Sequence, residues 1–168
     1  MEIRLNDEKS MGEFRLPEYR EIPDVGLYLK QVVKFVNDAV SEYMGVTVTD
    51  SMLSNYVKLH MVASPVKKLY YRDHIAVLLF ISLAKSVLSL ENLDALLKKR
   101  TEKYTVEETY TAFKGLLEKA LESVYSNCGK DKEKDIDDDL RLMSTIATAM
   151  SYTCYLNSCF VKTEEEKK

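Results

Sequence analysis

Apolar residues recur at steps of three and four positions over most of this chain, which is the spacing of one face of an α-helix. One short segment, residues 66–71, instead alternates apolar and basic side chains as a β-strand would. Helices are predicted over residues 24–43, 51–60, 73–88, 93–100, 105–126 and 136–160. The pattern therefore predicts a mainly α fold with a minimal β segment.

Local signals set the expected ends of the first two helices. Pro23-Asp24 is expected to open the first helix, and Gly45 is expected to end it. Thr49 or Asp50 is a suitable N-cap for the short helix that follows. The prolines and glycines number only three and five in 168 residues, which favours long helices over sheet.

The same pattern divides the chain into four regions. These are an N-terminal arm (1–22), a helical domain (23–100), a C-terminal helical region (101–163) and a charged tail (164–168). Leu16, Tyr19 and Ile22 are expected to dock the arm onto the core. Residues 75–84 are apolar at nearly every position, so the helix that contains them is predicted to be buried on all sides.

The short second helix carries one polar face. Ser51, Ser54, Asn55 and Lys58 lie on it at three- and four-residue steps, whereas Tyr56 is expected in the core. Short polar and basic side chains on one helix face can reach base edges and phosphates of DNA. Asn55 would pair with adenine, and Lys58 with a guanine edge or a phosphate.

A basic turn follows the break at residues 63–65. Lys67, Lys68 and Arg72 are expected to contact phosphates, together with the hydroxyl of Tyr71. Residues 49–75 hold four basic and two acidic side chains, an excess of +2, while the whole chain has a net charge of −3. Such a basic patch on an acidic body predicts modest, salt-sensitive DNA binding. The alternative explanation is a solvated surface loop.

These pieces resemble a known DNA-binding unit. The stretches SMLSNYVKLHMV, SPVKK and LYYRDHIAVL resemble the winged helix-turn-helix of the MerR class of bacterial regulators. The tract from LPEYREIPDVGLYLKQV to about Leu97 resembles a family of bacterial proteins called domain of unknown function 1836 (DUF1836). The resemblance implies a MerR-like winged helix-turn-helix with a minimal β wing. The apolar stripes of the remaining sequence predict a C-terminal helical hairpin or bundle after it.

The C-terminal region offers surfaces for a partner. Thr105 and Glu108 fit a capping box at the start of its first helix. Residues 142–161 contain no charged side chain, and the last helix has two apolar stripes, so it needs partners on both sides. Polar residues dilute this segment, so we expect packing within a homodimer and no membrane anchor. The alternative role of this region is to form an effector pocket, lined by Met143, Met150, Tyr152 and Tyr155.

Enzyme chemistry has little support in the sequence. The chain has two histidines, of which His74 is expected to cap or pack a helix, and it lacks the common nucleotide-binding, hydrolase and metalloprotease motifs. Three cysteines without CxxC spacing predict neither a disulfide framework nor a metal site. No cofactor is expected, and the charged N-terminus is not that of a signal peptide, which favours the cytoplasm.

The sequence therefore predicts a dimeric regulator that binds a pseudo-palindromic DNA site non-covalently and is not an enzyme. The alternative hypothesis is a helical adaptor or small-molecule-binding protein that keeps the MerR-like scaffold without binding DNA.

Overall fold

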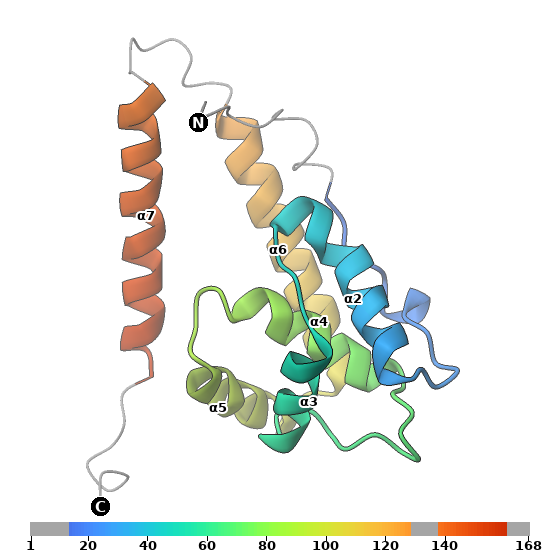
Figure 1. Ribbon diagram of the computed structural model, residues 1–168. Coiled ribbons are helices and arrows are strands. Elements are labelled where there is room, and N and C mark those ends of the chain that lie inside the picture. The colour runs from blue at the N-terminus through green and yellow to red at the C-terminus, as the bar shows by residue number, and fades with distance from the viewer. Residues whose placement is uncertain (1–13, 129–137, 161–168) are drawn as a thin grey trace, which may run out of the picture.

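The computed structural model describes residues 14–128 and 138–160, and this part of the chain is mainly helical (Figure 1). The helices are η1 (Tyr19–Glu21), α2 (Leu29–Met44), α3 (Asp50–Lys58), α4 (Arg72–Ala84), α5 (Leu90–Thr101), α6 (Val106–Cys128) and α7 (Asp138–Ser158). The mainly α prediction is confirmed. No β-strand occurs among the described residues, where pairing is limited to two isolated antiparallel bridges.

Helix α4 is the centre of the core. Seven of its thirteen residues are buried, and they are Ile75, Ala76, Leu78, Leu79, Ile81, Ser82 and Leu83. Helices α2 and α6 both pack on α4, and α3 packs on α2. The predicted burial of this helix on all sides is confirmed for these seven residues, whereas Val77, Phe80 and Ala84 are half-buried. Helix α6 shares the core with the helices that precede residue 100.

The arm before α2 is tied to α6. Phe14, Leu16 and Ile22 are buried in the core, and Tyr19 packs partly against it. The Leu16 amide donates a hydrogen bond of 2.9 Å to a carboxylate oxygen of Glu118. These contacts confirm the predicted docking of the arm.

A second group of contacts holds the arm through a largely buried lysine. Lys114 Nζ lies 2.8 Å from Glu18 Oε1 and 3.0 Å from Glu118 Oε2, and Lys114 is only 9% exposed. Hydrogen bonds to the two carboxylates raise the pKa of Lys114 against the opposing effect of burial. Lys114 is therefore charged and paired on both sides at neutral pH.

The predicted start of the first helix is wrong. Helix α2 begins at Leu29 rather than at residue 24. Gly26 has a φ of +73°, which an α-helix does not use, and Leu27 exchanges two backbone hydrogen bonds of 2.8 Å with Tyr70. Pairing with a distant segment thus overrides the local helix signal, whereas the expected stop at Gly45 is confirmed by a φ of +60°.

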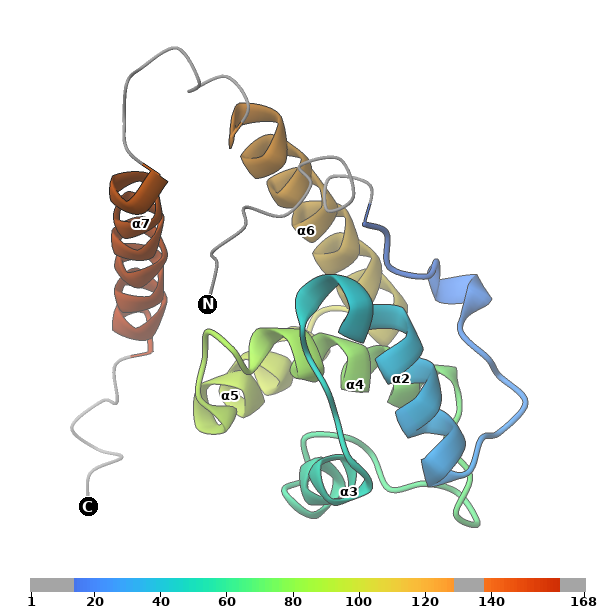
Figure 2. The same cartoon turned by 45° about the horizontal axis from the view of Figure 1, so that its top comes forward.

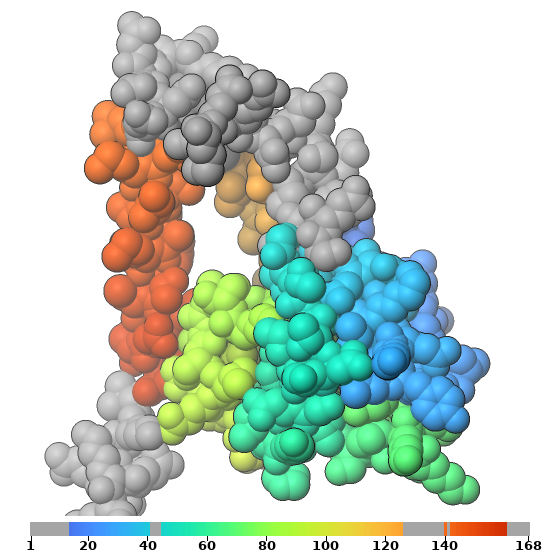
Figure 3. Space-filling model, viewed as in Figure 1, coloured from blue at the N-terminus to red at the C-terminus, as the bar shows by residue number. Residues whose placement is uncertain are grey.

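Helix α7 stands apart from the other helices in both ribbon views (Figures 1 and 2). The space-filling view shows an opening between most of α7 and the rest of the molecule, which closes towards the C-terminal end of the helix (Figure 3). At that end Leu156 and Phe160 pack against the core, and Asn92 Nδ2 donates to Asn157 Oδ1 at 3.4 Å. Among the described helices, none has the length and apolar character required to cross a bilayer.

Candidate nucleic-acid interface

Helix α3 is fixed by one face and displays the other. The Thr49 side chain caps it by accepting a hydrogen bond of 3.3 Å from the Met52 amide. Leu53 and Tyr56 are buried, which confirms Tyr56 as a core residue. Of the predicted DNA-binding residues on this helix, Ser54 is half-buried and the other three are exposed, namely Ser51, Asn55 and Lys58. The structure therefore brings these four onto one accessible helix.

The C-terminal end of α3 contains a strained residue. The Met61 amide donates to the Tyr56 carbonyl at 3.1 Å, and the His60 amide donates to the Val57 carbonyl at 3.0 Å. This pair of bonds is a Schellman motif. In this motif, the residue just before the outermost amide donor is usually glycine. Here that residue is His60, with a φ of +57°. This left-handed conformation is uncommon for any non-glycine residue, and it was not predicted from the sequence.

Two lysines form the tip of a turn between α3 and α4. Val66 and Leu69 exchange two backbone hydrogen bonds, of 3.0 and 2.9 Å. The residues between them, Lys67 and Lys68, have φ of +50° and +68° and are exposed. Two consecutive positive φ values are the signature of a type I′ hairpin turn, whose preferred residues are Asn and Gly. The expected basic turn is present as this two-residue hairpin.

The segment that carries this turn lies along the same edge of the molecule as α3 in both ribbon views (Figures 1 and 2). Val66 at the turn and Leu59 just after α3 are also exposed, at 56% and 46%. The edge therefore presents a polar helix face and a basic turn from consecutive parts of the chain.

The Arg72 side chain is held by contacts within the fold rather than left available to DNA. Its Nε donates to the Ile22 carbonyl at 2.9 Å, and its Nη1 lies 3.7 Å from Asp24 Oδ2. Its guanidinium also stacks over the Tyr19 ring at 5.5 Å. The predicted phosphate contact by Arg72 would compete with these bonds to the N-terminal arm.

Tyr71 and His74, on either side of Arg72 in the sequence, shape the start of α4. His74 Nδ1 accepts a hydrogen bond of 3.0 Å from the Tyr71 amide. His74 thereby caps α4, which confirms the expectation for this histidine. The half-buried ring of Tyr71 packs on His74, with the ring centroids 6.3 Å apart. The structure thus uses both side chains in packing at this end of α4.

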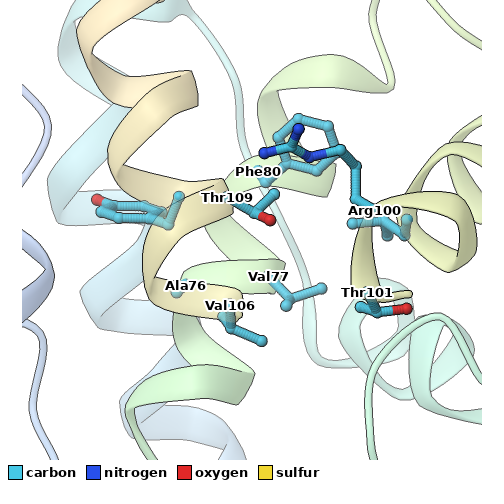
Figure 4. Close-up of a pocket in the computed structure, with 9 residues that line it drawn as sticks. Ala76, Val77, Phe80, Arg100, Thr101, Val106 and Thr109 are labelled. Atoms are coloured by element: carbon cyan, nitrogen blue, oxygen red, sulfur yellow. The ribbon is translucent and has the colours of Figure 1, made fainter. Parts of the chain in front are cut away.

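Two cavities lie beside α4. The smaller, of about 20 Å³, is lined by residues of α4, α5 and α6 (Figure 4). Thr109 lines it, and its hydroxyl is buried without a hydrogen-bond partner among the described residues.

The larger cavity, of about 400 Å³, lies next to residues 60–63, the segment that follows α3. The segment after α3, the start of α4 and one face of α5 form most of its wall, and His60, Asp73, His74, Asp94 and Lys98 are its titratable residues. Asp94 Oδ2 accepts a hydrogen bond of 2.6 Å from Lys98, whereas Asp94 Oδ1 is buried without a hydrogen-bond partner among the described residues. This cavity was not predicted, because residues from four segments are needed to form it.

The effector pocket predicted on the last helix is not formed by either cavity. Met143, Met150, Tyr152 and Tyr155 all lie on α7, each between 62% and 68% exposed. The two cavities are lined by residues from 60 to 110. Within the described ranges, no cluster of three or more His, Cys, Asp or Glu side chains could hold a metal ion.

Residues 17–128 match the family described as "Domain of unknown function (DUF1836)". The match covers about two thirds of the 168 residues, so the chain belongs to this family. It extends through α6, beyond the limit near Leu97 inferred from the sequence, and it ends before α7. No curated protein and no solved structure matches the chain.

Proposed function

We propose that this protein is a cytoplasmic, DNA-binding transcriptional regulator in which α3 reads the major groove and the turn at Lys67 and Lys68 contacts phosphates. The observation that carries the proposal is the pair of adjacent, exposed lysines held at positive φ beside the open face of α3. In this interpretation the unit acts as a MerR-like winged helix-turn-helix with its wing reduced to the hairpin turn.

Backbone strain supports a functional role for this turn. A left-handed conformation costs a non-glycine residue about 1–2 kcal/mol, and Lys67 and Lys68 both adopt it. Asn-Gly would form the same turn at far lower cost. Strain of this kind is retained chiefly where the side chains serve a function. Two ammonium groups on an exposed turn suit the phosphate backbone of DNA.

The face of α3 supplies groups suited to reading bases. The Asn55 amide can bond bidentately to adenine, and Lys58 can reach a guanine edge or a phosphate. Ser51 and Ser54 are short enough to let the helix approach the groove closely. Arg72 is left out of the proposed interface, since its guanidinium already binds the Ile22 carbonyl.

Gel-shift titration with DNA from the protein's own promoter region tests the proposal. Sequence-preferred binding is expected at low salt. Lys67→Ala/Lys68→Ala should weaken binding to all sequences alike and lower the slope of log affinity against log salt by roughly 2. The matched control is Lys99→Ala/Lys103→Ala, which removes two exposed lysines, one in the last turn of α5 and one just after that helix. The proposal fails if no sequence is preferred, or if both double variants lose affinity equally.

A second candidate function, small-molecule binding, is favoured by the 400 Å³ cavity behind α3. This volume lies within the range of small-molecule sites. Asp73, Asp94 and Lys98 give its wall a net charge of −1, and the other lining residues include Met61, Val62, Val77 and Leu97. Such a wall suits an apolar molecule that carries one amine.

Calorimetric titration with phenethylamine, and with phenylacetate as the anionic counterpart, tests this candidate. Phenethylamine is expected to bind and phenylacetate is not. Ala63→Trp should block the cavity from its exposed rim, while Ala63→Ser should leave binding unchanged. Equal binding of both compounds, or binding unaffected by Ala63→Trp, would exclude the cavity as the site.

A further inference from the structure

Helix α7 lacks the packing that a helix of its length needs. In proteins, most of the stability of a helix comes from burial of one face against a partner. Yet Leu140, Met143, Ile146 and Met150 are 57%, 66%, 58% and 62% exposed. The intrachain contacts of α7 involve the opposite stripe, where Leu156 packs on the core near its C-terminal end.

The exposed side chains follow a heptad spacing. Leu140, Met143, Ala147, Met150 and Cys154 are separated by alternating steps of three and four residues, which are the a and d positions of a coiled coil. Ile146 flanks this stripe at a g position. An average spacing of 3.5 residues keeps a stripe in register with a second helix along its length. We call these six residues the α7 seam.

The polar residues of α7 do not oppose burial of the seam. Thr148, Ser151 and Thr153 donate hydrogen bonds of 2.9, 2.8 and 2.9 Å to carbonyl oxygens four residues earlier in the same helix. Their hydroxyls therefore keep a partner when water is removed. Residues 142–160 carry no charged side chain, so no ion has to be desolvated.

We infer that the α7 seam pairs with the α7 seam of a second copy of this chain. The uncharged stretch 142–160 holds five of the six seam residues and is compatible with an identical neighbour, because it places no like charges opposite one another across a two-fold axis. The stripe that contains Leu156 and Phe160 is already turned to the chain's own core, which leaves the seam for another molecule. The opening beside α7 in Figure 3 agrees with a helix that is not packed along its length within its own chain.

The available area is sufficient for a stable dimer. Burial of a large aliphatic side chain removes on the order of 100 Å² from water. The four largest seam residues on two copies therefore account for roughly 800 Å², and the two smaller seam residues, Ala147 and Cys154, raise this to about 1,000 Å². That is the area of about 1,000 Å² that a specific interface needs to reach.

Sedimentation equilibrium of the full chain tests the inference. The wild type is expected to sediment at micromolar concentration as twice its mass of 19.3 kDa. Met143→Glu/Met150→Glu places two carboxylates in the seam and should weaken dimerisation by at least about 100-fold. The matched control is Thr148→Glu/Tyr155→Glu, with the same two charges seven residues apart on another exposed face of α7, and it should stay dimeric. A thermal melt of each variant verifies that the α2–α6 body still unfolds cooperatively.

Three results overturn the inference. The first is a monomeric wild type. In that case α7 either folds onto the exposed Leu116 and Val124 of α6 or binds a membrane surface, which flotation with phosphatidylcholine vesicles detects. The second is a dimer that survives the seam variant, and the third is equal dissociation of both variants. The inference does not depend on DNA binding, because a dimer without DNA affinity would sink only the proposed function.

Discussion

Arg72 Nε donates a hydrogen bond of 2.9 Å to the carbonyl oxygen of Ile22, fifty positions earlier in the chain. The bond joins the first residue of α4 to the segment that leads into α2. Arg72 therefore holds the N-terminal arm in place. Its guanidinium is bonded within the fold, whereas Lys67 and Lys68 are exposed.

Arg72→Ala should reduce the free energy of unfolding by about 2 kcal/mol, because a charge-assisted hydrogen bond to a carbonyl group is lost. Urea denaturation measures this change. Arg72→Lys keeps the charge but loses the planar donor group, so its free energy of unfolding should lie between those of the wild type and Arg72→Ala. Unchanged stability together with a large loss of DNA affinity would instead restore Arg72 to the phosphate-binding set.

Three glycines allow a graded test of the backbone. Gly26 has a φ of +73°, and a Cβ there would lie 3.2 Å from Leu69 Cδ1, whereas a Cβ at Gly45, with a φ of +60°, would meet nothing within 4 Å. Gly115 lies within α6 and also has open space. Gly26→Ala should destabilise by about 2 kcal/mol and Gly45→Ala by about 1 kcal/mol. Gly115→Ala should stabilise by about 0.5–1 kcal/mol, since alanine favours a helix interior.

Thermal unfolding of the three variants, with urea titration for the free energies, measures the order. Equal losses at residues 26 and 45 would mean that the contact with Leu69 is unimportant and that strain alone acts at both positions.

Local signals in the sequence predicted the helix ends that depend on neighbouring residues. The Thr105 side chain and the Glu108 carboxylate bond reciprocally to each other's backbone amides, as the capping box requires. Thr49 caps α3 for the same reason. Both contacts span three residues, so their partners can be identified from sequence spacing alone.

Features that depend on distant segments were missed or misplaced. The start of α2 is set by pairing between Leu27 and Tyr70, which no local pattern shows. The structural role of Arg72 depends on the carbonyl of Ile22 in the same way. The sequence did indicate two stripes on the last helix, but only the structure distinguishes the stripe that meets the core from the one that remains open.

Tyr110 makes stability sensitive to alkaline pH. Its hydroxyl donates to the Pro17 carbonyl at 2.8 Å, and burial, reinforced by the charges of Glu18 and Glu118, raises its pKa well above the ordinary value of 10. A raised pKa means that the folded chain holds this proton more tightly than the unfolded chain. The contribution is therefore complete below pH 10 and is lost as pH rises from 10 towards the folded pKa.

Urea titrations between pH 9 and pH 11.5 should show stability falling above pH 10. Tyr110→Phe should lower stability at pH 8 by about 1 kcal/mol through the lost hydrogen bond. It should also reduce the alkaline slope by up to about 1.4 kcal/mol per pH unit. Tyr152→Phe, on the exposed surface of α7, is the control and should leave the slope unchanged. An unaltered slope in Tyr110→Phe would assign the alkaline loss to other groups.

Lys67→Asn/Lys68→Gly separates the strain of the turn from its charge. Asn-Gly is the preferred pair for a type I′ turn, so the substitution should relieve two left-handed lysines and raise the free energy of unfolding by about 1–2 kcal/mol. The same change removes both ammonium groups and should weaken DNA binding as strongly as Lys67→Ala/Lys68→Ala does. Stability by urea denaturation and affinity by gel shift should therefore move in opposite directions. If the variant gains stability and keeps full affinity, the lysines are not the phosphate contacts. If it gains no stability, the turn is not strained and the physical reason for assigning it a function disappears.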